Sequence, residues 1–209
     1  MIKTIIFDFD GVLIDSYELH YQMSRKQIKD LTREEHKKLF EGNIHVQREK
    51  MKERFTDFEF KNELDKATMN KKISKIIQEA ILKLSEEYSS GIISSGRENL
   101  IKSILENAGV LDKFIFIYGE ETHKIKFNKF NIAFKKFSLK KEETIFVTDT
   151  LGDIFEADKI GIKSIAIDSG FHEKGRLEKG KPMKIIHEMS ELEDILKDYP
   201  TFGSAKMFR

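Results

Sequence analysis

The stretch that decides the fold is Met1–Ser16, MIKTIIFDFDGVLIDS, at the start of the chain. Its apolar run Ile2–Phe7 is rich in β-branched residues and is typical of a strand buried on both faces in a parallel sheet. Asp8 and Asp10 follow where open α/β sheets bind their ligands, and Gly11 allows a turn that can bring both side chains to one pocket. Such a pair can act as nucleophile and general acid/base or hold a hard cation, whereas an Asp-rich turn without chemistry is the alternative.

The composition fits a soluble globular protein with a heavily charged surface. Of the 209 residues, 35% are charged and 39% hydrophobic, and 37 Lys+Arg nearly balance 36 Asp+Glu, so we expect neither nucleic-acid nor membrane binding. The absence of cysteine excludes disulfides, thiolate metal sites and cysteine nucleophiles. With no signal peptide and no apolar run near the roughly 18 residues of a membrane span, we expect a cytoplasmic protein. The sequence gives no indication of the oligomeric state.

Strands and helices are predicted to alternate along most of the chain. Short apolar runs predict strands at Ile2–Phe7, Gly91–Ser94, Phe114–Tyr118, Thr144–Thr148 and Ser164–Ile167. Helical spacing of apolar residues recurs in Asn99–Ala108, Phe127–Phe137, Ile154–Ile160 and Glu191–Leu196, and a loose tail is expected at Thr201–Arg209. This order of elements indicates βαβ units and an α/β fold with a Rossmann-like parallel sheet.

Residues 17–84 break this alternation. The segment is highly charged, has no convincing strand, and shows helical patches at Glu34–Phe40, Val46–Phe55 and Ile73–Leu84. We therefore predict a helical insert between the first two strands, whose last helix leads back into the core. The predicted domains are a core of residues 1–16 and 85–209 and a helical cap of residues 17–84.

Three further segments place polar groups at the ends of apolar runs. Ser94 and Ser95 end a predicted strand before a helix, where hydroxyls and free amides can bind phosphate, although an ordinary helix cap is the alternative. Lys124 and Lys126 precede the helix that begins the Phe pattern. Asp149 and Asp153 follow the strand Thr144–Thr148, either as a second acidic site or as a loop with a capping aspartate.

Together these motifs resemble the haloacid dehalogenase (HAD) superfamily of phosphotransferases, and Val12–Ser16 resembles its phosphoglycolate phosphatase and β-phosphoglucomutase branch. The resemblance implies a small C1-type helical cap after the first strand. It also implies that Asp8 is the nucleophile and Asp10 the general acid/base. Because Asp10 is present, haloacid dehalogenation is not expected.

The same resemblance assigns the remaining motifs. Ser94 would bind the phosphoryl group, with the amide of Ser95 in the same cradle. One lysine would offset the charge of the aspartate and the phosphoryl group. We favour Lys126, whose distance to Asp149 suits members without a proline after the lysine, while Lys124 fits the spacing of the Lys-Pro branch.

The resemblance further implies a Mg²⁺ site with oxygen ligands only. The ligands would be Asp8, the backbone carbonyl of Asp10, and Asp149, with Asp153 ordering the site from outside. Thr148 stands where the family usually has glycine, which leaves both carboxylates of this motif in place.

We therefore expect a Mg²⁺-dependent phosphatase that hydrolyses a small phosphorylated metabolite through an aspartyl phosphate. A phosphomutase of the β-phosphoglucomutase type uses the same acid/base pair and stays open, as does a catalytically idle module that binds partners. Asn43, His45 and Arg48 follow Gly42 where related caps present a specificity loop. We expect the histidines to be surface residues and the lysines of Lys124–Lys136 to lie mainly on solvated helix faces.

Overall fold

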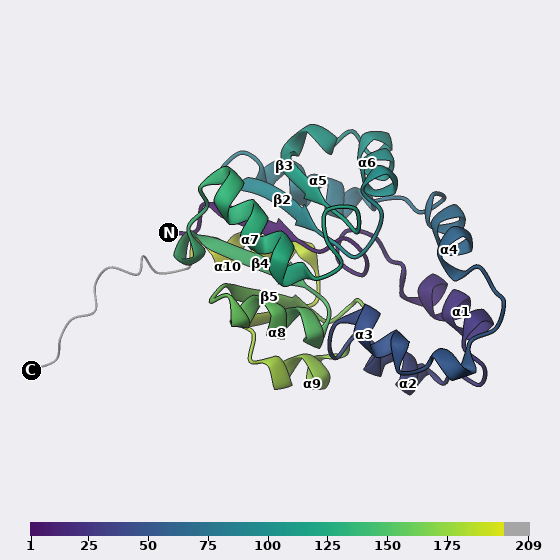
Figure 1. Cartoon of the computed structure of the whole chain (residues 1–209). Coiled ribbons are helices and arrows are strands. Elements are labelled where there is room, and N and C mark those ends of the chain that lie inside the picture. The colour runs from purple at the N-terminus through teal and green to yellow at the C-terminus, as the bar shows by residue number, and fades with distance from the viewer. Residues whose placement is uncertain (199–209) are drawn as a thin grey trace, which may run out of the picture.

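The computed structural model describes residues 1–198 and has a six-stranded parallel sheet of order β3-β2-β1-β4-β5-β6 at its centre (Figure 1). The strands are β1 (Thr4–Phe7), β2 (Ser89–Ile93), β3 (Phe114–Tyr118), β4 (Thr144–Thr148), β5 (Lys163–Ile167) and β6 (Lys184–Ile186). The register pairs Phe7 of β1 with Ile92 of β2 on one side and with Val147 of β4 on the other. The ends of β1, β2 and β4 therefore meet at one edge of the sheet.

Helices cover both faces of the sheet. The helices α5 (Lys75–Leu84), α6 (Glu98–Asn107) and α10 (Leu192–Lys197) share a buried apolar cluster with Ile5 and Phe7 of β1. The helices α7 (Lys126–Phe137) and α8 (Leu151–Lys159) pack in a second cluster with Ile6 of the same strand. Because neighbouring strand residues point to opposite faces, β1 contributes to both layers, as its apolar run predicts. The α/β fold with a Rossmann-like parallel sheet is confirmed.

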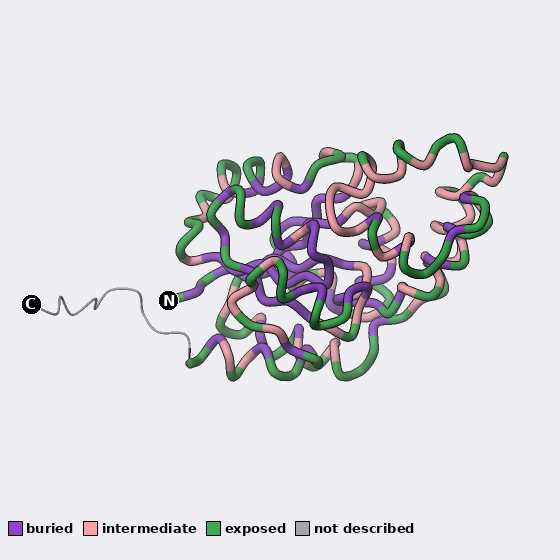
Figure 2. Tube along the Cα trace, turned by 90° about the horizontal axis from the view of Figure 1, so that it is seen from below, coloured by how far each residue is buried: buried purple, intermediate pink, exposed green. Residues whose placement is uncertain are grey.

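The predicted helical insert after the first strand is confirmed as α1 (Tyr17–Gln27), α2 (Arg33–Lys38), α3 (Ile44–Glu49) and α4 (Phe60–Thr68), followed by α5. The first four helices extend away from the sheet, and their residues are mostly exposed or intermediate in burial (Figure 2). They enclose a small apolar cluster of their own around Ile28, Leu31 and Leu39. Ile81 and Leu84 of α5 instead belong to the core cluster, which agrees with the expectation that the last helix of the insert leads back into the core.

The cap is joined to the core by polar contacts near α8 and α9 (Lys174–Leu177). The amide of Gly152 donates to the carbonyl of Phe40 at 2.9 Å. His172 accepts at Nδ1 from the amide of Leu151, so its Nε2–H donates to the carbonyl of Lys37 at 2.9 Å. Arg176 of α9 forms ion pairs with the cap carboxylates Glu34 and Glu41 and with Glu173 of the core.

The helix predicted at Val46–Phe55 is divided into α3 and a 3₁₀ turn at Lys52–Arg54. The reason is a non-local pairing: Phe55 forms a β-bridge with Ile28, so the chain must leave the helix before reaching it. The short edge strand β6 was not predicted, because its three residues follow Pro182 and give little periodicity. The predicted tail at Thr201–Arg209 lies outside the described residues. Across residues 1–198, no helix has the length and apolar character needed to cross a membrane.

Candidate active site

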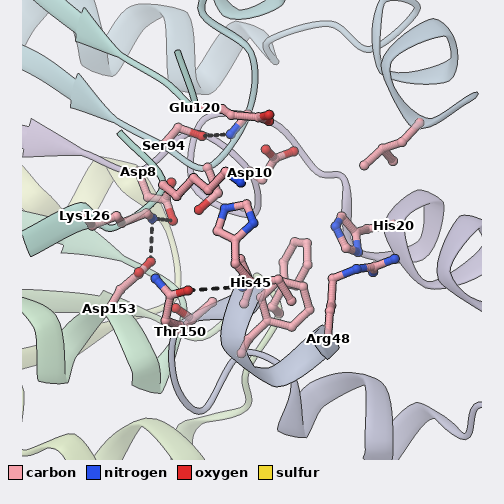
Figure 3. Close-up of a pocket in the computed structure, with 18 of the residues that line it drawn as sticks. Asp8, Asp10, His20, His45, Arg48, Ser94, Glu120, Lys126, Thr150 and Asp153 are labelled. Atoms are coloured by element: carbon pink, nitrogen blue, oxygen red, sulfur yellow. Dashed lines mark hydrogen bonds and ion pairs between the residues drawn. The ribbon is translucent and has the colours of Figure 1, made fainter. Parts of the chain in front are cut away.

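The predicted site residues meet at the sheet edge formed by the ends of β1, β2 and β4. Asp8, Asp10, Ser94, Ser95, Lys124, Lys126 and Asp153 all line a cavity of about 310 Å³ between this edge and the cap. Asp149 lies immediately behind the cavity and is fully buried. Figure 3 shows Asp8, Asp10 and Ser94 on the core side and Arg48 and His20 on the cap side of this space. The parallel register thus brings together groups that are about 140 residues apart in the sequence.

Lys126 joins two of the carboxylates. Its Nζ donates to Asp8 Oδ2 at 2.6 Å and to Asp153 Oδ2 at 2.7 Å. Burial raises the pKa of Asp8 well above its ordinary value, and the charge of Lys126 acts in the opposite direction. Burial also opposes the charge of Lys126 itself, but Asp153 and Asp8 hold the pKa of Lys126 above its ordinary value. Lys126 therefore stays a cation and favours the ionised form of Asp8.

Asp153 has a supporting position. Its Oδ2 accepts from Thr148 Oγ1 at 3.0 Å in addition to Lys126. Burial alone would raise its pKa, but Lys126 and these hydrogen bonds hold the pKa of Asp153 below its ordinary value. Thr148, which stands where glycine is usual, thus donates to the carboxylate that orients Lys126.

The turn after β1 directs Asp10 toward the segment Ser94–Gly96. The amide of Gly11 donates to the carbonyl of Ile14, and Ser16 Oγ donates to Asp10 Oδ1 at 2.7 Å. Asp10 Oδ2 lies beside Gly96, since a Cβ added there would be 3.6 Å from it and 3.4 Å from Ser94 Oγ. Burial raises the pKa of Asp10, which favours the protonated form.

Asp149 presents one unpaired oxygen. Its Oδ2 accepts from the amide of Phe171 at 2.7 Å, whereas its Oδ1 is buried and has no hydrogen-bond partner among the described residues. Burial raises the pKa of Asp149 to about 8. Gly11 and Gly170 press against this carboxylate, where an added Cβ would lie 1.9 and 2.3 Å from Oδ2. A buried carboxylate oxygen without a donor is what a bound cation would satisfy.

The donor set suits Mg²⁺ better than a transition metal. Residues 1–198 contain no group of three or more His, Cys, Asp or Glu side chains arranged to hold a metal. Mg²⁺ does not need one, because it is commonly held by one or two carboxylates together with waters and substrate phosphate. Asp8, the carbonyl of Asp10, and Asp149 therefore fit the predicted metal site.

Ser94 is fixed from two sides. Its Oγ accepts from the amide of Gly96 at 3.0 Å, and its carbonyl accepts from Lys129 Nζ. Lys129 is fully buried one turn after Lys126 on α7. Burial and the nearby charge of Lys126 lower the pKa of Lys129 to about 8. Lys126, which we favoured as the lysine of the site, is buried as well. The expectation that the other lysines of this segment are mainly solvated is wrong for Lys129, because the N-terminal end of α7 faces the sheet edge.

The cap supplies the other wall of the cavity. Arg48 stacks on Phe60, with its guanidinium carbon 3.8 Å from the ring centroid, and its Nη2 is buried without a partner among residues 1–198. Burial lowers the pKa of Arg48 to about 10, so it remains charged at neutral pH. His45 Nε2 is likewise buried and unpartnered within the described part of the chain. Asn43 caps α3 through His45 N and donates to Glu156 Oε1 at 3.1 Å, so its side chain is occupied by structural contacts.

Several residues that line or support the site had no signal in the sequence. Glu156 accepts from Asn43 and from the amide of Phe127 at the start of α7. His20 lines the cavity, and His36 is fully buried behind it. The expectation that the histidines lie on the surface is wrong for His36 and His172, both fully buried, because they occupy the contact between cap and core.

The chain resembles known proteins over nearly its whole length. Residues 5–167 match the family described as "Haloacid dehalogenase-like hydrolase". "Pyrophosphatase PpaX" of Bacillus mycoides (strain KBAB4) is 24% identical, with 93% of this chain and 97% of that protein covered.

Solved structures agree in fold. A predicted phosphatase from Clostridium acetobutylicum superposes with a TM-score of 0.78 at 21% identity, covering 94% of this chain and 99% of that one. A putative phosphoglycolate phosphatase from Lactobacillus plantarum gives 0.79 at 14% identity, covering 93% and 100%. The family match spans the sheet from β1 to β5 and includes each of the four motifs, and the chain therefore belongs to the haloacid dehalogenase-like hydrolases.

Proposed function

We propose that this hydrolase is a Mg²⁺-dependent phosphatase that acts on a small phosphorylated metabolite through an aspartyl phosphate on Asp8. The observation that carries the proposal is the position of Asp8 on the cavity floor. Its Oδ2 is hydrogen-bonded to Lys126, and Asp10 and Ser94 lie on the same side of the cavity (Figure 3).

In the first step, a carboxylate oxygen of Asp8 attacks the phosphorus and the bond to the leaving oxygen breaks. Lys126 stabilises the ionised carboxylate and the negative charge of the phosphoryl oxygens. Ser94 Oγ and the amides that follow it donate to those oxygens. Asp10 gives its proton to the leaving oxygen, which belongs to an alcohol in a phosphate ester and to a phosphate in pyrophosphate, and its raised pKa suits this role.

In the second step, a water molecule attacks the phosphorus of the aspartyl phosphate and Asp8 leaves as a carboxylate. Asp10, now ionised, accepts the proton of that water. Ser16 holds Asp10 Oδ1, so Oδ2 is the oxygen that can transfer the proton in both steps. One residue thus serves as acid and then as base.

Asp8, the carbonyl of Asp10, and Asp149 are the groups that would hold Mg²⁺, with Asp153 ordering the site through Lys126. Bound there, the ion supplies positive charge that offsets the phosphoryl oxygens in the transition state. The unpaired Oδ1 of Asp149 supports this assignment.

The cap side of the cavity favours a substrate with a second anionic group. Arg48 and His45 line this side, each with a buried polar nitrogen that has no partner among the described residues, and Lys124 adds a further cation to the wall. Relatives are named as a pyrophosphatase and a putative phosphoglycolate phosphatase. We therefore rank pyrophosphate and phosphoglycolate first among substrates, and the volume of about 310 Å³ favours small molecules. A cytoplasmic location and the absence of nucleic-acid partners belong to the same proposal.

The test is a panel of phosphorylated metabolites and 4-nitrophenyl phosphate, assayed for phosphate release with Mg²⁺ and with EDTA. We expect release that EDTA abolishes and Mg²⁺ restores. Conversion of a sugar phosphate to its isomer would identify a phosphomutase instead. No release from any substrate would identify an idle module, and release that EDTA does not affect would refute the metal assignment.

Arg48→Met tests the second anionic group. This variant is expected to lower kcat/KM for pyrophosphate or phosphoglycolate by about tenfold or more, since a hydrogen bond to a charged group contributes about 1.5–3 kcal/mol. The loss should be smaller for 4-nitrophenyl phosphate, which has no second anion. Equal losses on all substrates would show that Arg48 supports the fold rather than specificity.

A further inference from the structure

Two histidines of the cap, His20 and His36, form a short contact on the cap side of the cavity. His20 of α1 lines the cavity, while His36 of α2 is fully buried. His20 Nδ1 and His36 Nε2 are 3.0 Å apart, so one of the two nitrogens must carry the proton that joins them. Which of them does so decides what His20 can offer to the cavity.

Ser24 and Arg48 lie beside this hydrogen bond and are compatible with either direction. Arg48 can only donate, and its Nη1 lies 3.4 Å from Ser24 Oγ. Ser24 Oγ in turn lies 3.4 Å from His20 Nδ1. Because a serine oxygen can accept from two donors and can also donate, it can pair with His20 Nδ1 whether or not that nitrogen carries a proton. The direction is therefore decided by the second ring nitrogen of His36.

His36 Nδ1 is buried and has no partner in the described part of the chain. If His20 donated, the proton of the neutral His36 ring would lie on Nδ1 and would be an unpaired buried N–H. If His36 donates, its Nδ1 is only an unpaired lone pair, which is the smaller defect because buried N–H groups without a partner are rare in proteins. The proton between the two rings therefore belongs to His36 Nε2.

Both rings are held neutral. Burial is the main cause that lowers the pKa of His20 and of His36, which falls to about 3 for His36, and the charge of Arg48 acts in the same direction. Phe40, Phe60 and Phe171 surround the His20 ring at centroid distances of 5.2–5.6 Å and fix its plane. A neutral His20 whose Nδ1 accepts must carry its proton on Nε2.

We propose that His36 is a positioning residue that fixes the Nε2–H tautomer of His20, and that His20 donates from Nε2 to the leaving group of the bound substrate. The proposal rests on the proposed phosphatase function. It gives the cap a neutral donor beside the cation Arg48. His36 belongs to α2, which does not line the cavity, so α2 influences substrate selection only through the tautomer of His20.

The test combines nitrogen NMR of the full chain with kinetics. In ¹⁵N-histidine-labelled protein at pH 7.5, the ring signals that His20→Gln removes should show a protonated Nε2 and a bare Nδ1. His36→Leu removes the donor and should mix the His20 tautomers, whereas His36→Gln keeps an amide donor near the Nε2 position and should preserve the tautomer. His187→Leu, at an exposed histidine paired with Asp168, is the matched control.

The kinetic readout is the ratio of kcat/KM for the best metabolite of the panel to kcat/KM for 4-nitrophenyl phosphate. We expect this ratio to fall about tenfold in His36→Leu, mainly through KM, because one hydrogen bond of about 1–1.5 kcal/mol is lost. His36→Gln should restore most of the ratio, and His187→Leu should retain it.

A His20 ring that is protonated on Nδ1 or charged at pH 7.5 would overturn the proposal, as would an unchanged ratio in His36→Leu. If His36→Leu does not fold, the wild-type spectrum and His36→Gln still decide the tautomer. If the wild type hydrolyses no phosphate ester, the proposed function fails, while the tautomer measurement still tests the role of His36.

Discussion

Replacing the buried Lys129 with Met should change how stability depends on pH. Lys129 is fully buried, donates only to the carbonyl of Ser94 among the described contacts, and has its pKa lowered from 10.5 to about 8, first by burial and then by Lys126. Between these two pH values the unfolded chain holds the proton and the folded protein does not. The free energy of unfolding of the wild type therefore increases as pH rises through this interval. Below pH 8 Lys129 is charged in the folded protein, which then bears the full free-energy cost of burying that charge.

The magnitude follows from the two pKa values. The lowering of the Lys129 pKa corresponds to about 3 kcal/mol of unfolding free energy, and the wild type should recover about 2 kcal/mol of this between pH 7 and pH 9.5. The free energy of unfolding of Lys129→Met minus that of the wild type should thus fall by about 2 kcal/mol over this range. Taking the difference removes the contribution of groups that titrate in both proteins.

The assay is urea unfolding of both proteins in EDTA at pH 7 and 9.5, followed by circular dichroism. Lys135→Met, at an exposed lysine of the same helix, controls for the loss of one positive charge. A Lys129→Met difference that does not vary with pH would refute the reasoning, because Lys129 would then have its ordinary proton affinity in the folded protein.

Three further variants test the geometry. Gly11→Ala should lower kcat by about a hundredfold or more, because its Cβ would meet Asp149. The control Gly109→Ala has a similar positive φ and no neighbour within 4 Å, so it should cost only about 1–2 kcal/mol of stability. Equal activity of the two variants would contradict this. Arg176→Met should loosen the cap, seen as severalfold faster hydrogen exchange in α2 with a higher KM, and unchanged exchange would mean that its ion pairs do not hold the cap. Phe130→Ala should cost about 3–5 kcal/mol in urea unfolding, since this ring of α7 is fully buried against Phe146 of β4. A cost below about 1 kcal/mol would contradict the packing.

Local patterns were sufficient to predict five of the six strands and the turns that follow them. The strands Phe114–Tyr118 and Thr144–Thr148 have the predicted bounds, because an apolar run between charged segments marks where each strand begins and ends. Asp8 and Lys126 are 118 residues apart, yet each could be placed at the end of its own element. The parallel topology then brings these residues together, because the C-terminal ends of neighbouring parallel strands meet at one edge of the sheet.

Contacts made by the cap could not be predicted in this way. The pairing of His20 with His36, and of Arg176 with Glu34, depends on how helices dock and not on the spacing of residues within one helix. Lys129 shows the same limit, because a lysine in a charged helix gives no signal that it faces the sheet. The sequence indicates where chemistry is placed on the core, but not what the cap presents to it.

The central claim, covalent catalysis by Asp8, is tested most directly with Asp10→Asn and 4-nitrophenyl phosphate. This substrate has a good leaving group that does not need a general acid, whereas hydrolysis of the aspartyl phosphate still needs Asp10 as base. Rapid mixing with Mg²⁺ should release one nitrophenolate per molecule of enzyme in a burst, and mass spectrometry of the acid-quenched protein should locate the phosphoryl group on Asp8. Steady turnover without a burst and without phosphate on Asp8, or a phosphoryl group on another residue, would contradict the account.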